Sequence, residues 1–217
     1  IEGDTEGTVT VKNKIDIKGT ASDVDAAIKD VDTFSDTTTN ADVTLTSDPT
    51  LAQLVSINNK IEGTITLEGS QNYSQALSGS TADVKAALAG TFANTYKGNV
   101  TLTDSSTDSA VQATDITTIE GDTTGTITVS HNMHIEGTSA QVDTAVGHVD
   151  NFSGTNGPQT VTLTSDPTLT ELVTINNKIE GTITLQGTNN YGLALSGSTA
   201  LVKAALAGTF ASTYTGN

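Results

Sequence analysis

Three histidines are the side chains of this sequence best suited to metal binding or general base catalysis. His131 and His134 lie three residues apart on an expected strand, so their side chains point to opposite faces of it. A zinc site needs converging ligands, usually four, and none of the three histidines, His148 included, has a counterpart in the repeat described below. We therefore predict no metal site at these histidines and interpret them as surface substitutions.

The sequence around the recurring serines lacks the features of a catalytic serine nucleophile. Ser78-Gly79-Ser80 recurs as Ser196-Gly197-Ser198, but the G-x-S-x-G elbow is absent and no histidine recurs to serve as a base. The chain has no cysteine, which excludes a thiol nucleophile, a cysteine metal site and a disulfide framework. These serines are expected to be turn and cap residues, and we predict that the chain is not an enzyme.

Carboxylates are abundant and could serve in paired acid–base catalysis or as ligands of a hard cation. The first repeat carries an acidic patch of Asp23, Asp25, Asp30, Asp32 and Asp36. Only Asp25 and Asp32 recur, as Asp143 and Asp150, which favours a solvated face. No cofactor is expected. Calcium is the alternative that the acidity favours, although neither EF-hand spacing nor a G-G-x-G-x-D repeat occurs.

The charge balance excludes two classes of partner. The 217 residues include 25 acidic and nine basic side chains, all nine of them lysine, for a net charge of −16. Nucleic acids and anionic membranes bind clustered positive charge, so neither is an expected partner. No apolar run approaches the roughly 18 residues of a membrane span, so no membrane insertion is expected.

A tandem repeat organises the chain and must be considered before the fold is assigned. Residues 1–99 align without a gap with residues 119–217, and about two thirds of the aligned positions are identical. The triplet Ile-Glu-Gly opens four pieces within this period. We predict a first repeat at 1–118, with sub-repeats 1–60 and 61–118, and a truncated second repeat at 119–217, with sub-repeats 119–178 and 179–217.

Each sub-repeat has the same order of local signals, β-β-α-β-α. Alternating β-branched residues predict strands, and apolar residues at helical spacing predict short helices. The expected strands are 8–11, 14–18, 43–46, 64–67, 73–78 and 100–103, and the expected helices start at Thr20, at Pro49, at Thr81 (to Ala93) and near Ala110. Thr20 and Asp48 are expected N-caps, and Asn58-Asn59 an expected left-handed helix end.

Strand, short helix and strand in alternation predict an α/β fold with a parallel β-sheet built by right-handed crossovers. We favour a repeat solenoid, in which each unit buries its apolar face only against its neighbours. Tandem α/β domains arranged like beads are the alternative, but no Gly/Ser or Pro linker separates the sub-repeats.

The expected core follows from the strand alternation and the helical stripes. Val9, Val11, Val43, Leu45, Ile65 and Leu67 are predicted to be buried against the helices. A stripe of Val24, Ala27, Ile28 and Val31 is expected on the first helix, and one of Val84, Leu88, Phe92 and Tyr96 on the third. All eight aromatic residues occur in pairs 118 residues apart, which favours core positions over a binding site.

Threonine makes up about a fifth of the chain, and Thr-x-Thr pairs occur on the main strands. The intervening Val, Ile and Leu must face the helices, so the threonines should be exposed on one parallel sheet and form ladders across it. This array resembles the threonine arrays of ice-binding solenoids, while its simpler use is as an uncharged, strand-forming surface. The predicted ladder consists of Thr8, Thr10, Thr44, Thr46, Thr64, Thr66, Thr101, Thr103, Thr126, Thr128, Thr162, Thr164, Thr182 and Thr184.

The recurring strands Gly-Thr-Ile-Thr-Leu and Gly-Thr-Val-Thr-Val, the Val-Thr-Leu-Thr segments and residues 79–88 carry a family resemblance. The chain resembles the tandem-repeat regions of very large secreted bacterial cell-surface proteins, notably those of cyanobacteria. That resemblance implies an extracellular, cell-surface or appendage location.

The predicted function is therefore structural or adhesive: repeats that form a rod, fibre or cell-surface layer. An ice- or glycan-binding module that uses the threonine ladder is the alternative, as is a segment of a phage fibre. Neither end carries the polar cap that a solenoid needs, so the expected partners are further repeats of the same chain or identical subunits, end to end.

Overall fold

The computed structural model describes residues 7–35, 41–153 and 157–217 as an α/β protein with several parallel sheets and short helices. It divides into two compact units. The first unit comprises Ile1–Ser78, Ala82–Val100 and Asp122–Gly125, and the second comprises Gly79–Thr81, Thr101–Gly121 and Thr126–Asn217. Every strand pair whose register is described is parallel, as the alternation of strands and helices predicts.

The first unit is built around a four-stranded sheet in the order β2-β4-β5-β7. Strands β1 and β3 form a separate two-stranded sheet. Its strands are β1 (Thr10–Val11), β2 (Ile15–Gly19), β3 (Thr33–Phe34), β4 (Ala41–Leu45), β5 (Thr64–Leu67) and β7 (Thr91–Phe92). Its helices are α1 (Ala21–Lys29), α2 (Leu51–Asn58), the 3-10 helix η2 (Asn72–Ser74) and α3 (Thr81–Leu88).

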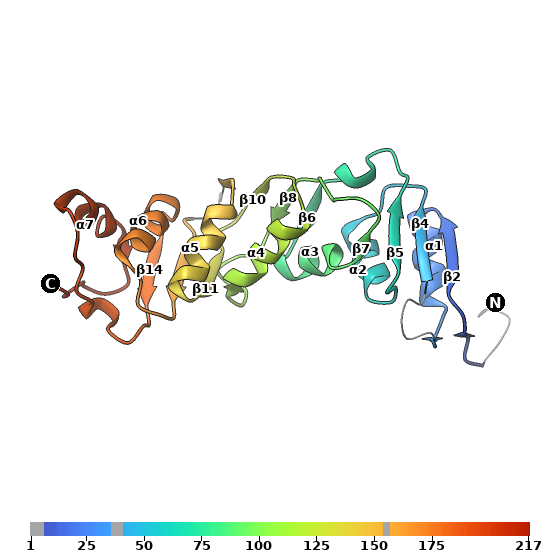
Figure 1. Cartoon of the computed structure of the whole chain (residues 1–217), viewed down its shortest axis with the longest axis horizontal. Helices are drawn as coiled ribbons and strands as arrows, with labels where there is room; N and C mark the ends of the chain where they lie inside the picture. The colour runs from blue at the N-terminus through green and yellow to red at the C-terminus, as the bar shows by residue number, and fades with distance from the viewer. Residues whose placement is uncertain (1–6, 36–40, 154–156) are drawn as a thin grey trace. The chain divides into compact units, whose positions relative to one another are not determined.

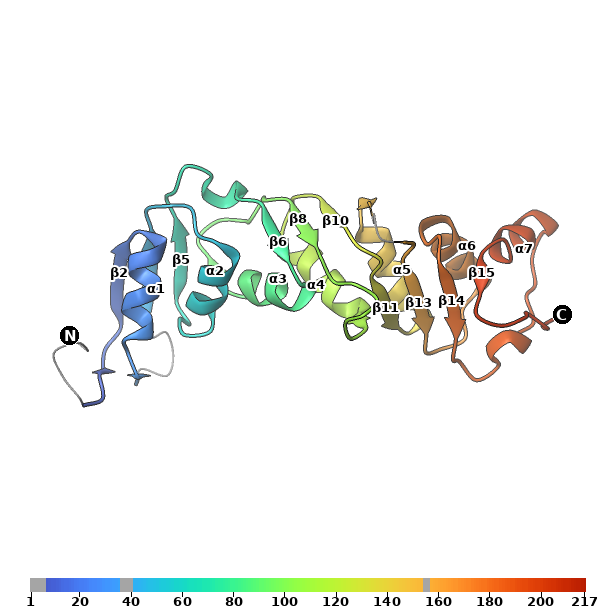
Figure 2. The same cartoon turned by 180° about the vertical axis from the view of Figure 1, so that it is seen from behind.

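The core of this unit lies between the sheet and helices α1 and α2, which pack side by side (Figures 1 and 2). Period-2 alternation turns one face of each strand inward, and Val43, Leu45, Ile65 and Leu67 are all buried as predicted. Val9 and Val11 are only half-buried, because β1 pairs with the two-residue strand β3 and lies outside the four-stranded sheet.

The second unit repeats this plan with a five-stranded sheet in the order β15-β14-β13-β11-β9. Its strands are β9 (Val111–Gln112), β10 (Ile127–Val129), β11 (His134–Gly137), β12 (Asn151–Phe152), β13 (Thr160–Leu163), β14 (Thr182–Leu185) and β15 (Thr209–Phe210). Its helices are α4 (Ala113–Asp122), α5 (Ser139–His148), α6 (Leu169–Lys178), the 3-10 helix η3 (Asn190–Gly192) and α7 (Thr199–Ala205). Strands β6 (Leu77–Gly79) and β8 (Val100–Leu102) are each divided between the two units.

Helices α5, α6 and α7 follow one another along this sheet in Figure 2, and α5 packs on β11 and β13. The apolar side chains of the strands and helices interlock in between. Val161, Leu163 and Ile183 on the sheet and Val142 and Leu172 on the helices are fully buried.

Threonine residues cap two helices in each unit, α1 and α2 in the first and α5 and α6 in the second. The Thr20 hydroxyl accepts a hydrogen bond from the backbone N–H of Asp23, as predicted for α1. Helix α2 starts two residues later than expected: Thr50, with Gln53, forms its capping box, and Pro49 precedes the cap. Asp48, the expected cap, instead accepts hydrogen bonds from the Ser70 hydroxyl and the Gln71 backbone.

Several predicted elements are shorter than the sequence indicated. Helix α3 ends at Leu88 rather than Ala93, because Ala89-Gly90 is followed by Thr91-Phe92, which forms the strand β7. Tyr96 therefore lies beyond the helix, in a parallel bridge with Thr123. On α1 the predicted stripe is buried except for Ala27, which is exposed.

The expected strand at 73–78 is wrong over its first half, where η2 forms and only 77–79 is extended. Asn72, which opens this turn, has φ +49°. The last expected helix starts at Ala113 rather than near Ala110, because Val111-Gln112 pairs with β11.

The expected order β-β-α-β-α misses one strand in the first sub-repeat, whose observed order is β-β-α-β-β-α. The extra strand, β3, pairs over only two residues, too few to show an alternating pattern. The prediction of one parallel sheet is also wrong: the described strands belong to four separate sheets, so the Thr-x-Thr pairs do not share a single surface.

Candidate functional site

The predicted ladder threonines lie on the outer faces of the sheets or at strand ends, but most are not fully exposed. Thr162 is buried, with 6% of its surface accessible, which contradicts the prediction for this residue. The half-buried ones are Thr44, Thr64, Thr66, Thr101, Thr103, Thr128, Thr182 and Thr184, and the exposed ones are Thr8, Thr10, Thr46, Thr126 and Thr164. Neighbouring strands shield each side chain, because β-strands lie only about 4.8 Å apart.

In the first unit, threonines share the outer sheet face with charged residues. Thr44 pairs with Thr66 across β4 and β5, and Lys18 occupies the same row on β2. Lys18 Nζ reaches Glu68 at 2.8 Å, and Lys14 Nζ reaches Asp42 at 2.7 Å. This face is therefore crossed by two ion pairs and is not a uniform array of hydroxyls.

Asp42 links that face to the backbone. Its Oδ1 accepts a 2.7 Å hydrogen bond from the backbone N–H of Thr64. The hydrogen bond from Lys14, followed by that from Thr64, lowers the pKa of Asp42 below the usual aspartate value. The carboxylate is thus held ionised, and it fixes the start of β5.

The outer face of the second unit's sheet carries the most continuous run of hydroxyls, which we call the unit 2 threonine face. It consists of Thr160, Thr162, Thr182, Thr184 and Thr209, with His134 and Glu136 on the same face of β11. Thr162 pairs with Thr184 across β13 and β14, and Thr182 pairs with Thr209 across β14 and β15, so the hydroxyls form two short rows. The predicted ladder did not include Thr160 or Thr209. Thr160 precedes the predicted pair Thr162/Thr164 on the same strand, and Thr209 lies on the two-residue strand β15, which has no Thr-x-Thr pair.

His134 is tied into this face. Its Nδ1 lies 2.7 Å from the Thr160 hydroxyl and its Nε2 lies 3.1 Å from the Thr162 hydroxyl. A neutral imidazole has one donor and one acceptor nitrogen, and a hydroxyl can serve either, so the two hydroxyls can satisfy both ring nitrogens. His134 thus orders two of the threonines.

The other histidines lie elsewhere. His131 Nδ1 contacts the Ser130 hydroxyl at 2.9 Å, and His148 Nδ1 lies 3.6 Å from Glu120. Within the described ranges, no group of three or more His, Asp or Glu side chains is arranged to hold a metal ion. The same part of the chain contains no helix long and apolar enough to cross a membrane.

Several polar residues that recur in both repeats bind the backbone. Asp32 accepts a hydrogen bond from the backbone N–H of Val9 at 2.7 Å, and Asp150 accepts the equivalent bond from Ile127 at 2.8 Å. Both carboxylates are exposed, in agreement with the solvated face predicted for the acidic positions, and each also binds a backbone N–H.

Two further recurring pairs of side chains also bind the backbone. Lys60 Nζ donates to the carbonyl oxygen of Val31 at 2.8 Å, and Lys178 Nζ donates to that of Val149 at 3.1 Å. The hydroxyl of Tyr73 accepts the backbone N–H of Leu67 at 3.1 Å, and its counterpart 118 residues later does the same. These contacts join segments about 6 to 29 residues apart and hold successive elements together.

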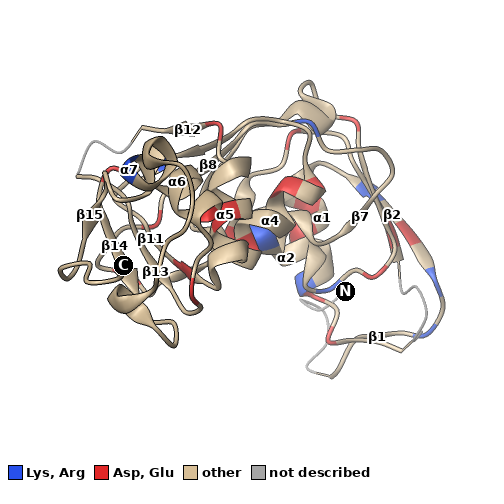
Figure 3. Ribbon diagram, turned by 60° about the vertical axis from the view of Figure 1, so that its left-hand side comes forward, with Lys and Arg blue, Asp and Glu red and all other residues tan. Residues whose placement is uncertain are grey.

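Asp25 also has a structural partner, since Lys29 Nζ contacts its Oδ2 at 2.7 Å on the same helix. Burial raises the pKa of Asp25, but hydrogen bonds from Lys29 and Ser56 outweigh it and lower that pKa overall. Figure 3 shows the acidic positions scattered over helices, strands and loops rather than collected on one element. Asp36 lies outside the described residues.

Of the recurring serines, Ser198 is a cap residue as predicted, whereas Ser78 lies in strand β6 rather than in a turn. Ser198 caps α7 by accepting a hydrogen bond from the Leu201 backbone. Ser78 and Ser196 are exposed, and the aromatic residues are half-buried apart from Tyr96.

Comparison with known proteins identifies no relative: no family model, no curated protein and no solved structure matches this chain. The functional argument therefore rests on the chain's own repeat and on its surface.

Proposed function

We propose that this chain is a structural or adhesive repeat protein of the cell surface or an appendage, in which the repeats continue as a solenoid. One observation carries the proposal: three polar side chains that recur at the 118-residue period bind the backbone of neighbouring elements. Asp32, Lys60 and Tyr73 are types that serve catalysis elsewhere, yet here each joins one element to the next. Such contacts favour a chain selected for extension rather than for a reaction.

The proposed mechanism is mechanical. Each added repeat contributes another set of parallel strands and helices, and presents another outer face rich in threonine. Stability in such a chain is approximately a sum of repeat stabilities and nearest-neighbour interfaces. The proposal requires no cofactor, and its partners are further repeats or identical subunits, placed outside the cell.

Small-angle X-ray scattering tests the rod directly. A compact chain of 217 residues would have a radius of gyration of about 17 Å. We expect a clearly larger radius and the scattering profile of a rod, at several protein concentrations so that self-association is recognised. A radius near the compact value would contradict the solenoid and favour a globular arrangement.

Binding to ice or to a glycan surface is a second candidate, supported by the rows of hydroxyls on the unit 2 threonine face. We expect thermal hysteresis at sub-millimolar protein if this face binds ice, and its loss in Thr184→Lys, which places a charged chain beside Thr162. Thr188→Lys, at an exposed site outside the sheet, is the matched control. Unchanged ice growth with the native protein would remove this candidate.

A further inference from the structure

A polar hollow of about 340 Å³ lies within the second unit, beside the segment that leads into β13. Small-molecule sites are hollows of about 300 to 1,000 Å³ with a few convergent polar groups, so its size is at the lower end of that range. None of its residues belongs to the unit 2 threonine face. We call it the α6–β13 hollow, and its lining consists of Phe152, Gly157, Pro158, Gln159, Lys178 and Glu180.

Gln159 is the residue that distinguishes this hollow, because its amide side chain is almost entirely buried. Only 4% of the residue's surface is accessible. Its Nε2 donates a 3.0 Å hydrogen bond to the carbonyl oxygen of His131, and a carbonyl oxygen can only accept, so this contact fixes the orientation of the amide. The other amide atom, Oε1, receives no hydrogen bond from any residue that the structure describes. An oriented acceptor without a donor is available to a ligand.

Two charged side chains of opposite sign line the same hollow. The Lys178 ammonium uses one of its three donors on the carbonyl oxygen of Val149, at 3.1 Å. Glu180 is exposed, and within the described part of the chain its carboxylate has no ion-pair or hydrogen-bond partner. The hollow therefore offers donors and acceptors together, and its two charges balance.

This combination of groups selects the chemistry of a ligand. An anion would be repelled by the Glu180 carboxylate and the Gln159 oxygen, and a cation would be repelled by the Lys178 ammonium. A hydroxyl group both donates and accepts, so a neutral ligand with several hydroxyl groups satisfies all three side chains. The half-buried ring of Phe152 adds an apolar surface on which the C–H face of a sugar ring can pack.

The first repeat has the same position without the amide. The aromatic ring and both charges recur there, as Phe34, Lys60 and Glu62, whereas the counterpart of Gln159 is Ala41. Ala41 is fully buried at the start of β4, so an alanine is compatible with this position in the strand. The repeat fold therefore does not require an amide here, and Gln159 adds a polar group that the first repeat lacks.

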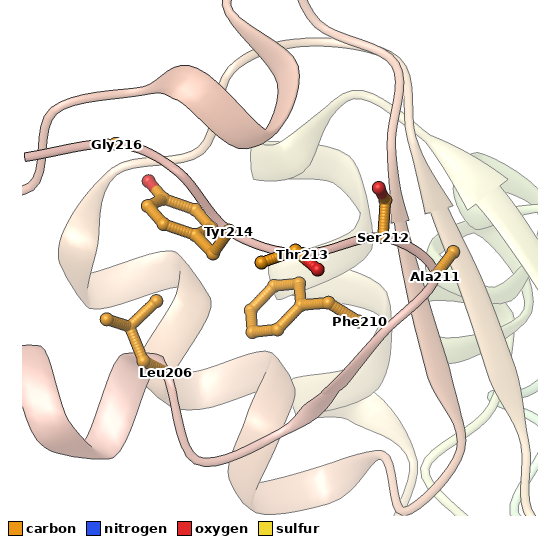
Figure 4. Close-up of a pocket in the computed structure, with 7 residues that line it drawn as sticks. All are labelled: Leu206, Phe210, Ala211, Ser212, Thr213, Tyr214 and Gly216. Carbon is orange, nitrogen blue, oxygen red and sulfur yellow. The ribbon is translucent and has the colours of Figure 1, made fainter.

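The hollow drawn in Figure 4 differs from this one in its lining. Leu206, Phe210 and Tyr214 point toward one another there, and the seven described residues that line it include no charged side chain. The Tyr214 hydroxyl is already engaged, because it donates to the carbonyl oxygen of Leu193. Such a lining does not indicate a ligand class, so the inference concerns the α6–β13 hollow alone.

We propose that the α6–β13 hollow binds a neutral sugar ring of a glycan. One ring hydroxyl donates to Gln159 Oε1, a second donates to the Glu180 carboxylate, and the Lys178 ammonium donates to a ring or hydroxyl oxygen. The C–H face of the ring packs on Phe152. This inference rests on the adhesive part of the proposed function and names what the chain holds.

Saturation-transfer difference NMR with the full chain tests the site. The probes are methyl β-D-glucopyranoside, methyl β-D-galactopyranoside and methyl α-D-mannopyranoside, each titrated alone. We expect saturable binding of at least one of these glycosides. Glycine or inorganic phosphate at the same concentration should not displace it, because neither is a neutral compound with several hydroxyl groups.

Two substitutions each remove one of the proposed contacts. Glu180→Gln should weaken glycoside binding about tenfold, because hydrogen bonds to a charged acceptor are the stronger ones. Gln159→Ala, which introduces the residue of the first repeat, should weaken it about fivefold. Glu62→Gln is the matched control: it makes the same change at the equivalent position of the first repeat, where Ala41 replaces the amide, and should leave the affinity unchanged. Circular dichroism of each variant separates lost binding from lost folding.

Three outcomes would overturn the inference. The first is that none of the three glycosides binds the folded protein. The second is binding that Glu180→Gln and Gln159→Ala both leave unchanged, which would place the glycoside elsewhere, as on the unit 2 threonine face. The third is displacement by glycine or phosphate, which would assign the hollow to a charged ligand. Scattering tests the rod separately: an extended chain that binds no glycoside loses only this site, and a compact chain that binds one keeps the site and loses the rod.

Discussion

The side-chain amide of Asn58 caps a helix other than its own. Its Nδ2 donates to the carbonyl oxygens of Ala86 and Ala87, which belong to the last turn of α3 and have no partner within that helix. The sequence pattern predicted instead that Asn58-Asn59 would adopt a left-handed conformation at the end of α2. That prediction is wrong, since Asn59 is right-handed with φ −68°. Asn176 repeats the contact, donating to Ala204 and Ala205 at 3.0 and 2.7 Å.

Asn58→Ala should therefore destabilise the first unit although it removes little apolar contact. Losing the donor leaves two carbonyl oxygens of α3 without their partner, which costs roughly 1–2 kcal/mol. Chemical denaturation followed by circular dichroism measures the change. Asn59→Ala, at the exposed neighbouring position, is the control and should change the unfolding free energy by less than about 0.5 kcal/mol. Equal effects of the two substitutions would contradict the capping role.

At the scale of elements, the long strands and the helix starts could be predicted because their signals are local. Thr64–Leu67 alternates strictly, and its inward residues Ile65 and Leu67 are buried. The residue types of Thr20 and Asp23 and their spacing of three are sufficient to predict the start of α1. Local physics suffices for such elements.

Other elements depend on partners distant in sequence and could not be predicted. Strands β3 and β7 are two residues long and exist because β1 and β5 offer them a free edge. Phe92 and Tyr96 continue a spacing of four residues from Leu88, and they were therefore included in the apolar stripe of the predicted third helix. The helix ends before them, and Gly90 follows it at a point where the side chain of Asn58 leaves no room for a Cβ. The candidate site could likewise be predicted only in part. The Thr-x-Thr pattern indicates which residues lie on the outer faces, but the contacts of His134 with Thr160 and Thr162 depend on which strands are neighbours in the sheet.

At the scale of the whole molecule, the proposed solenoid and the bead-like alternative predict different coupling between the two units. In a solenoid each coil buries its apolar face only against its neighbours, so loss of one unit also removes an interface from the next. Independent beads share no such interface. The stability of one unit, measured while the other is damaged, therefore distinguishes the two arrangements.

Val43→Asp is the substitution that damages the first unit most directly. Val43 is 1% exposed and lies on β4 between Ile17 and Ile65, so an aspartate there buries an unpaired charge and should cost roughly 3 kcal/mol or more. Hydrogen exchange of the backbone amides in β11, β13 and β14 then reports on the second unit. The solenoid predicts that their protection falls about tenfold, which corresponds to about 1.4 kcal/mol of lost coupling. Thr44→Asp, on the outer face of the same strand, should leave those amides unchanged. Full protection of the second unit in Val43→Asp would favour independent beads, because a solenoid cannot lose a coil without exposing the face of its neighbour.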